Sequence, residues 1–207
     1  MIQNPEQRVG IFIDTQNMYY SARFLFKHKV NFKNILTDAV AKRKLIRAIA
    51  YVVRTKTHEE SSFFEALQKA GIETKEKELM EYLSGQKKAD WDVGLTIDVV
   101  RMMDMLDVIV LVSGDGDYIP LIEYAKNRGR IVEVIAFRET TSTKLTEVAD
   151  RYINLSENPK RYILMSSQTI KERDEKKVEK NKISKTTKKK KTEKSDKKTK
   201  QKHKITF

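Results

Sequence analysis

Two aspartates, Asp115 and Asp117, stand two residues apart in the segment SGDGD, directly after the apolar run VIVLV. Like charges this close repel each other, and a turn needs only one of them. Neighbouring carboxylates raise each other's pKa, and a bound cation would relieve this repulsion by neutralising both charges. The simpler interpretation is a turn around Asp115, with Gly114 and Gly116 supplying permissive backbone angles, followed by a helix that Asp117 caps.

Two further aspartates occupy comparable positions. Asp14 ends the apolar segment RVGIFID, and Asp92 begins a helical pattern after a polar loop. Asp92 also fits a helix cap, whereas a carboxylate at the end of a buried strand needs a partner. With Asp115 and Asp117 they make four carboxylates, which we expect at one edge of a parallel sheet. Oxygen ligands without His or Cys favour Mg²⁺ or Mn²⁺, and one or two such ions would promote phosphodiester hydrolysis.

Polar residues next to these aspartates are candidates for supporting roles. Asn17, three residues after Asp14, would orient Asp14 or a water, or cap its own helix. Ser113 is expected to hydrogen-bond a carboxylate or a phosphate, although a small inert residue also fits that position. Lys87 and Lys88 are expected to hold a phosphate backbone.

Other titratable residues are weaker candidates. Asp98 follows Asp92 by six residues, which on a helix places it about 120° around the axis and about 9 Å along it. A shared metal is therefore disfavoured, and solvent or a salt bridge is the predicted environment of Asp98. The histidines stand in polar or lysine-rich contexts (His28, His58 and His203), so a metal would have to generate the nucleophile.

Apolar and helical patterns alternate along the first 156 residues. Strands are predicted at 8–14, 46–53, 72–79, 107–113, 131–137 and 151–155. Helices are predicted at 17–26, 32–43, 61–71, 92–106, 118–129 and 141–150, with a polar loop at 84–92. This alternation predicts an α/β fold with a mainly parallel sheet. Ligands of such sheets bind outside the carboxyl ends of the strands.

Charge is distributed unevenly along the 207 residues. The net charge is +13, and residues 170–207 contain 17 Lys and Arg against 6 Asp and Glu. This segment has too few apolar residues to compensate its ordering entropy, so we expect a disordered tail. The lysines would contact RNA phosphates, with affinity gained from the release of counterions. The same lysines also fit a merely solubilising tail, or a nuclear import signal in a eukaryotic host.

Composition excludes several classes of protein. The absence of cysteine excludes disulfides and thiolate metal sites. No apolar run approaches the roughly 20 residues that span a bilayer, and the first residues lack a signal-peptide pattern, so a cytoplasmic protein is expected. A P-loop motif is absent, and GDGDYI lacks the third glycine of a dinucleotide fingerprint. Phosphatases of the haloacid-dehalogenase type usually need an aspartate where this chain has Gln16.

Three segments, IFIDTQNMYY, KKADWDVGLTID and VLVSGDGDYIPLIEYAKNRGRIVEVIAF, resemble in order and spacing a NYN domain of the LabA-like branch of the PIN-like nuclease superfamily. The resemblance covers 8–156 and implies a Rossmann-like three-layer α/β/α domain that cleaves RNA with divalent metal. A linker at 157–169 and the tail at 170–207 would follow. The implied acidic cluster consists of Asp14, Asp92, Asp115 and Asp117, with Asn17 beside them.

One position departs from the family pattern, because Asp90 stands where relatives often have glycine two residues before the middle aspartate. Our leading hypothesis is a metal-dependent endoribonuclease. The alternative is a noncatalytic RNA-binding or adaptor protein with a NYN fold. Hydrolysis of small phosphoesters needs only the same metal site, and homo-oligomerisation stays possible.

Overall fold

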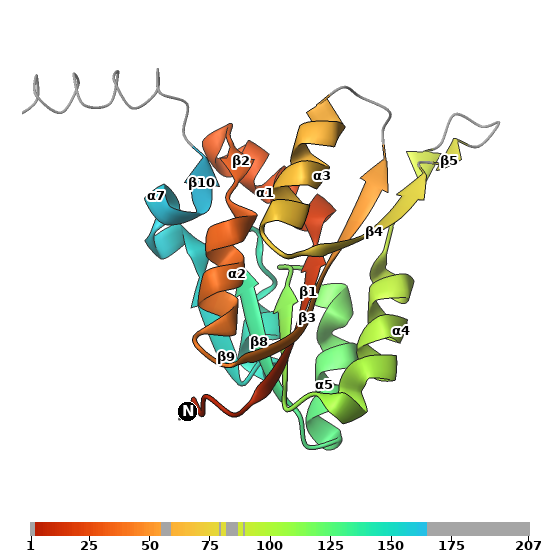
Figure 1. Cartoon of the computed structure of the whole chain (residues 1–207), viewed down its shortest axis with the longest axis vertical. Helices are drawn as coiled ribbons and strands as arrows, with labels where there is room; N and C mark the ends of the chain where they lie inside the picture. Colours follow the sequence, from red (N-terminus) through yellow and green to blue (C-terminus); the bar gives the residue numbers. More distant parts are fainter. Residues whose placement is uncertain (1–2, 55–58, 79, 82–86, 89, 165–207) are drawn as a thin grey trace, which may run out of the picture. The chain divides into compact units, whose positions relative to one another are not determined.

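The computed structural model describes residues 3–54, 59–78, 80–81, 87–88 and 90–164 (Figure 1). The predicted tail at 170–207 and residues 165–169 of the predicted linker lie outside the described residues. Within the described ranges, no helix is long and apolar enough to cross a membrane.

A six-stranded parallel sheet forms the centre of the domain, in the spatial order β4-β3-β1-β7-β8-β9. Its strands are β1 (Arg8–Asp14), β3 (Lys44–Arg54), β4 (Glu73–Glu78), β7 (Val108–Val112), β8 (Ile131–Ala136) and β9 (Arg151–Asn154). Numbered along the chain, these strands have the doubly wound order 3-2-1-4-5-6, which reverses direction between β1 and β7. The predicted parallel α/β fold is confirmed, and β1 and β7 are neighbours.

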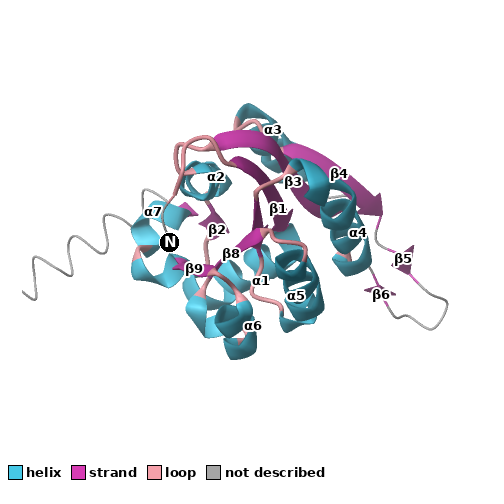
Figure 2. Cartoon of the chain, turned by 90° about the horizontal axis from the view of Figure 1, so that it is seen from below, coloured by secondary structure: helices cyan, strands magenta, loops and turns pink. Residues whose placement is uncertain are grey.

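Helices cover both sides of this sheet, with α2 and α3 on one side and α4 and α5 on the other (Figure 2). The helices are α1 (Thr15–Phe26), α2 (Phe32–Val40), α3 (Glu59–Lys69), α4 (Asp92–Met102), α5 (Ile119–Asn127), α6 (Thr143–Val148) and α7 (Pro159–Tyr162). Short strands pair β2 (Lys29–Val30) with β10 (Ile163–Leu164), and β5 (Met80–Glu81) with β6 (Lys87–Lys88). The 3-10 turns are η1 (Met103–Met105), η2 (Gly116–Tyr118), η3 (Arg138–Thr140) and η4 (Leu155–Glu157).

The central strand β7 shows why its sequence is a continuous apolar run. All five of its residues are at least 98% buried. Ile109 and Leu111 join the core cluster that α4 and α5 cover, and Val110 points to the opposite face because successive side chains alternate. Both faces are therefore dry, which is the usual state of a strand in a doubly covered parallel sheet.

Some predicted boundaries were wrong, for local reasons. The predicted helix at 32–43 ends at Val40, where Ala41 takes a left-handed conformation with φ 49° and closes the helix. The predicted helix at 92–106 is α-helical only to Met102 and finishes as the 3-10 turn η1. The predicted polar loop at 84–92 contains the short strand β6, whose residues pair with Met80 and Glu81.

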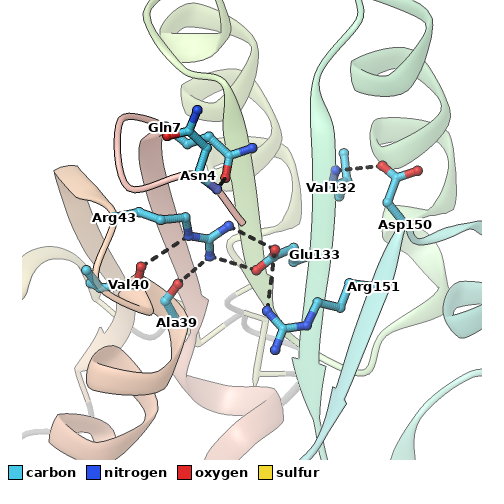
Figure 3. A network of polar contacts seen from close by, with 9 residues as sticks. All are labelled: Asn4, Gln7, Ala39, Val40, Arg43, Val132, Glu133, Asp150 and Arg151. Carbon is cyan, nitrogen blue, oxygen red and sulfur yellow. Dashed lines mark hydrogen bonds and ion pairs between the residues drawn. The ribbon is translucent and has the colours of Figure 1, made fainter. Parts of the chain in front are cut away.

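One pair of charges is completely buried beneath α2 (Figure 3). The Arg43 guanidinium donates to both carboxylate oxygens of Glu133 at 2.9 Å, and also to the carbonyls of Ala39 and Val40 at the end of α2. Both side chains are 1% exposed, and Arg151 lies 3.6 Å from the same carboxylate. Pairing with an opposite charge and hydrogen bonding offset the cost of removing these two charges from water.

Candidate metal centre

The loop after β7 places Asp115 and Asp117 at the carboxyl end of the sheet. Asp115 is the N-cap of the turn η2, and its Oδ1 accepts a hydrogen bond from the Asp117 backbone N at 3.0 Å. The cap of α5 is Tyr118, which makes no side-chain capping bond. The interpretation of Asp117 as a helix cap was therefore wrong. Asp117 keeps an exposed carboxylate that no helix end requires.

Asp14 is the last residue of β1 and is only 8% exposed. Its side chain has the partners that a buried carboxylate needs: the Asn17 backbone N donates to Oδ1 at 3.0 Å, and the Ser113 hydroxyl donates to Oδ2 at 3.2 Å. Asp14 is thereby the N-cap of α1 and fixes the direction in which this helix leaves the sheet. Ser113 contacts a carboxylate rather than standing open to a phosphate, because it is fully buried and also accepts from the Asp115 N.

Asp92 is the first residue of α4 and reaches the same edge of the sheet. The N-cap position of α4 is Trp91, which makes no side-chain capping bond, so Asp92 does not act as the cap. Trp91 instead donates from Nε1 to the Val52 carbonyl at 2.9 Å and packs edge-on against Tyr51. This anchor sets the start of α4, and the Tyr118 hydroxyl then holds Asp92 Oδ1 at 2.9 Å.

Three of the four predicted carboxylates form one cluster. Asp92, Asp115 and Asp117 each offer an oxygen, and these oxygens all lie within 4.8 Å of one another. Asp14 lies outside this group, yet the charges of Asp92 and Asp115 still act on it. The cluster lies beside β1 and β7, where the strand order reverses and open α/β sheets bind their ligands.

Electrostatics show that this arrangement is costly without a cation. Burial is the largest cause that raises the pKa of Asp14, and the charges of Asp92 and Asp115 raise it further against the two hydrogen bonds that lower it. Burial likewise raises the pKa of Asp92, with added repulsion from Asp115, Asp90 and Asp117. Carboxylate oxygens with this excess of negative charge form a donor set that fits a hard divalent cation.

The backbone of the loop is held by neighbouring segments. The Asn17 side-chain oxygen accepts from the Gly114 N at 3.0 Å, and the Ser142 N donates to the Gly114 carbonyl. A side chain at position 114 would lie 2.8 Å from the carbonyl oxygen of Thr140, so only glycine fits. The Asn17 side chain therefore orients the loop that carries Asp115, while the Asn17 backbone N binds Asp14.

The NYN domain family model matches residues 8–157. The chain belongs to the NYN domain family. This family lies within the PIN-like nuclease superfamily, and the acidic cluster accords with it. The matched range runs from the first residue of β1 to the last residue of η4.

Individual relatives share this domain. The low amplitude and bright protein LabA of Synechococcus elongatus is 28% identical over 163 residues, which span 72% of this chain and 84% of LabA. The uncharacterized protein MJ0482 of Methanocaldococcus jannaschii is 36% identical over 70 residues, which span 33% of this chain and 29% of that protein. The crystal structure of VPA0982 from Vibrio parahaemolyticus, a protein of unknown function, superposes with a TM-score of 0.71 at 27% identity, covering 79% of this chain and all of VPA0982.

Other predicted residues take different places in this NYN domain. Lys87 and Lys88 form β6, and their side chains are outside the described part of the chain. Asp98 has the predicted salt bridge, because Lys75 Nζ lies 2.6 Å from its carboxylate and Tyr51 donates to the same oxygen. Asp90 adds to the negative charge that acts on Asp92.

Sequence reasoning missed Tyr118, whose hydroxyl joins the loop after β7 to α4. Tyr118 is 1% exposed, and its pKa is raised by burial and by the nearby carboxylates, so it stays a hydrogen-bond donor. The available signal was its position, directly after Asp117 and before the apolar residues that begin the helix, because a buried tyrosine needs a partner for its hydroxyl.

Proposed function

We propose that this NYN domain protein is a metal-dependent ribonuclease that hydrolyses RNA phosphodiester bonds at the edge of the sheet between β1 and β7. The observation that carries the proposal is the meeting of three carboxylates, Asp92, Asp115 and Asp117, within 4.8 Å in a fold of the PIN-like nuclease superfamily. Oxygen donors alone favour Mg²⁺ or Mn²⁺ over softer cations.

The residues of the cluster have distinct tasks in this proposal. Asp92, Asp115 and Asp117 would hold the cation, which supplies an activated water and charge neutralisation at the phosphate. Tyr118 fixes one oxygen of Asp92 and leaves the other free to bind. The Asp117 N fixes one oxygen of Asp115 in the same way.

Asp14 and Asn17 support this centre from β1 and α1. Asp14 adds a negative charge beside the cluster and binds Ser113, which in turn accepts from the backbone of Asp115. Asn17 holds Gly114. A direct ligand role for Asp14 stays part of the proposal, since each of its carboxylate oxygens accepts one hydrogen bond and has a second lone pair.

The test compares the full chain with Asp115→Asn on mixed RNAs in Mg²⁺ or Mn²⁺. Asp104→Asn is the matched control, because Asp104 is an aspartate whose side chain is 92% exposed and which lies outside the cluster. We expect cleavage by the wild type and the control, and a loss of about 100-fold or more in Asp115→Asn, the size typical of losing one electrostatic contact to the transition state. Equal cleavage by all three proteins would refute the assignment.

The second candidate, a noncatalytic RNA-binding or adaptor protein, is supported by the lysines of residues 170–207. It predicts RNA binding that weakens steeply with salt and no cleavage with either metal. A nucleotide monophosphate included as a further substrate separates hydrolysis of small phosphoesters from hydrolysis of RNA.

A further inference from the structure

Helix α1 exposes large aromatic side chains to solvent. Tyr19 is 46% exposed, Tyr20 64% and Phe24 71%. The opposite face of the helix is buried through Met18 and Ala22, so the exposed rings are not needed for the core. The Tyr19 and Tyr20 rings lie edge-on with their centroids 5.5 Å apart, and exposed apolar groups that lie together in this way mark a binding surface.

Cations accompany these rings along the same side of the helix. Arg23 is exposed one position before Phe24, and Lys27 follows at the end of the helix with its Nζ 5.8 Å from the Phe24 ring. Residues three and four apart face the same side, which groups Tyr20 with Arg23 and Phe24, and Phe24 with Lys27. Helix α1 contains no aspartate or glutamate, so the charge of this face is positive.

The aromatic face is fixed rigidly to the acidic cluster. Helix α1 begins directly after Asp14, and its Asn17 binds the loop that carries Asp115. At a rise of 1.5 Å per residue, Tyr20 lies about 9 Å from Asp14 along the axis of α1, and Phe24 about 15 Å. These lengths are within reach of a strand whose phosphate lies at the cluster.

We propose that the exposed face of α1 binds single-stranded RNA, with bases stacked on Tyr20 and Phe24 and phosphates contacted by Arg23 and Lys27. Stacking on aromatic side chains combined with nearby cations is the general means by which proteins hold unpaired strands. A duplex offers no free base faces to these rings. The inference rests on the proposed function in that it names single-stranded RNA as the substrate, but binding itself needs no cleavage.

Charge favours RNA over a second copy of this chain. A twofold dimer through α1 would bring the same basic patch of each copy together, and α1 contains no acidic residue to pair with Arg23 and Lys27. Like charges placed face to face disfavour that contact, whereas a polyanion gains from both of them.

The experiment measures binding of a fluorescein-labelled single-stranded 12-nucleotide RNA to the full chain in EDTA, where metal-dependent cleavage is suppressed. The test variant is Tyr20→Ala with Phe24→Ala. Tyr124→Ala is the matched control, because Tyr124 is 41% exposed on α5 and lies beside Arg128, another aromatic-cation pair. We expect the dissociation constant to rise at least tenfold in the double variant and to stay unchanged in the control. Tyr20→Phe keeps an aromatic ring and should bind the RNA with the wild-type dissociation constant.

Two further measurements make the result specific. The ratio of variant to wild-type affinity for single-stranded RNA should persist at higher salt, because stacking releases no counterions. Duplex RNA should bind the variant and the wild type equally well. Unchanged affinity of the double variant, or an equal loss with duplex RNA, would overturn the inference. So would a wild-type dimer that the substitutions dissociate while RNA affinity stays the same, since that result assigns α1 to self-association.

Failure of this inference and failure of the proposed function give different results. Weakened RNA binding in the α1 variant, with no cleavage by the wild type in Mn²⁺, refutes the nuclease and leaves the binding face in place. Cleavage by the wild type, with unchanged affinity and KM in the α1 variant, keeps the nuclease and refutes the binding face.

Discussion

Two groups of charged side chains in this protein are built in opposite ways. Beneath α2, Glu133 is matched by Arg43 and approached by Arg151, and every oxygen of its carboxylate has a cationic partner. At the edge of the sheet, Asp92, Asp115 and Asp117 meet with one sign of charge. The two groups also differ in burial, since the Glu133 side chain is 1% exposed and Asp117 is exposed.

The difference separates a structural charge from one that awaits a partner. A matched pair completes its own hydrogen bonds, and breaking it only destabilises the fold. A cluster of like charges raises its own pKa values and is relieved by an external cation. The paired group therefore contributes to folding, and the unmatched group is where a ligand is expected.

The largest effect we expect is at the paired group. Glu133→Ala should lower the free energy of unfolding by about 3–5 kcal/mol, because it leaves the Arg43 guanidinium buried without its carboxylate. Replacing both partners, as Arg43→Met with Glu133→Leu, should recover most of that loss. Urea denaturation of the full chain measures both variants. A double variant as unstable as the single one would show that the pair does more than neutralise itself.

An intermediate effect is expected at the unmatched group. In the absence of metal, Asp115→Asn and Asp117→Asn should each preserve or raise the melting temperature, because one repelling charge is removed. Added Mn²⁺ at 100 times its dissociation constant should stabilise the wild type by about 2.7 kcal/mol, and both variants by less. Thermal melts with and without Mn²⁺ measure this. Identical shifts in all three proteins would return the SGDGD segment to an ordinary turn.

The smallest effect concerns pH. The folded-state pKa of Asp14 lies above its unfolded value, mainly through burial, so the folded protein binds this proton more tightly. Stability from this group is therefore highest in acid and falls as pH rises through the raised pKa. In EDTA, Asp14→Asn should gain stability relative to the wild type as pH rises from about 4 to 7. Denaturation across this range tests the sign, and a difference that shrinks with pH would contradict it.

Much of the molecule was predictable from the sequence, for physical reasons. The run from Val108 to Val112 is apolar at every position, which only a doubly covered strand requires, and it predicted both the strand and the parallel sheet. Asp14 and Asp115 follow two such runs, so their presence at one edge followed from the parallel arrangement of β1 and β7. Apolar runs and the residues that directly follow them therefore predict strands and the edge at which the strands end.

Other features depend on contacts between distant segments, which no local pattern records. Asp117 looked like a helix cap, yet Asp115 is the residue whose side chain caps the turn, by accepting a hydrogen bond from the Asp117 backbone N. The Asp117 carboxylate is therefore not used for capping. The Tyr118 hydroxyl reaches Asp92, which lies 26 residues earlier in the chain, and Arg43 reaches Glu133 across 90 residues.

The amino-acid sequence alone thus determined the α/β fold, the parallel sheet and the edge at which the aspartates lie, because hydrophobic periodicity and strand direction are local properties. Only the tertiary structure decided which carboxylates share a cluster, which one is held apart by capping α1, and which rings of α1 remain exposed. Those outcomes depend on hydrogen bonds and burial between segments that meet only when the sheet has formed.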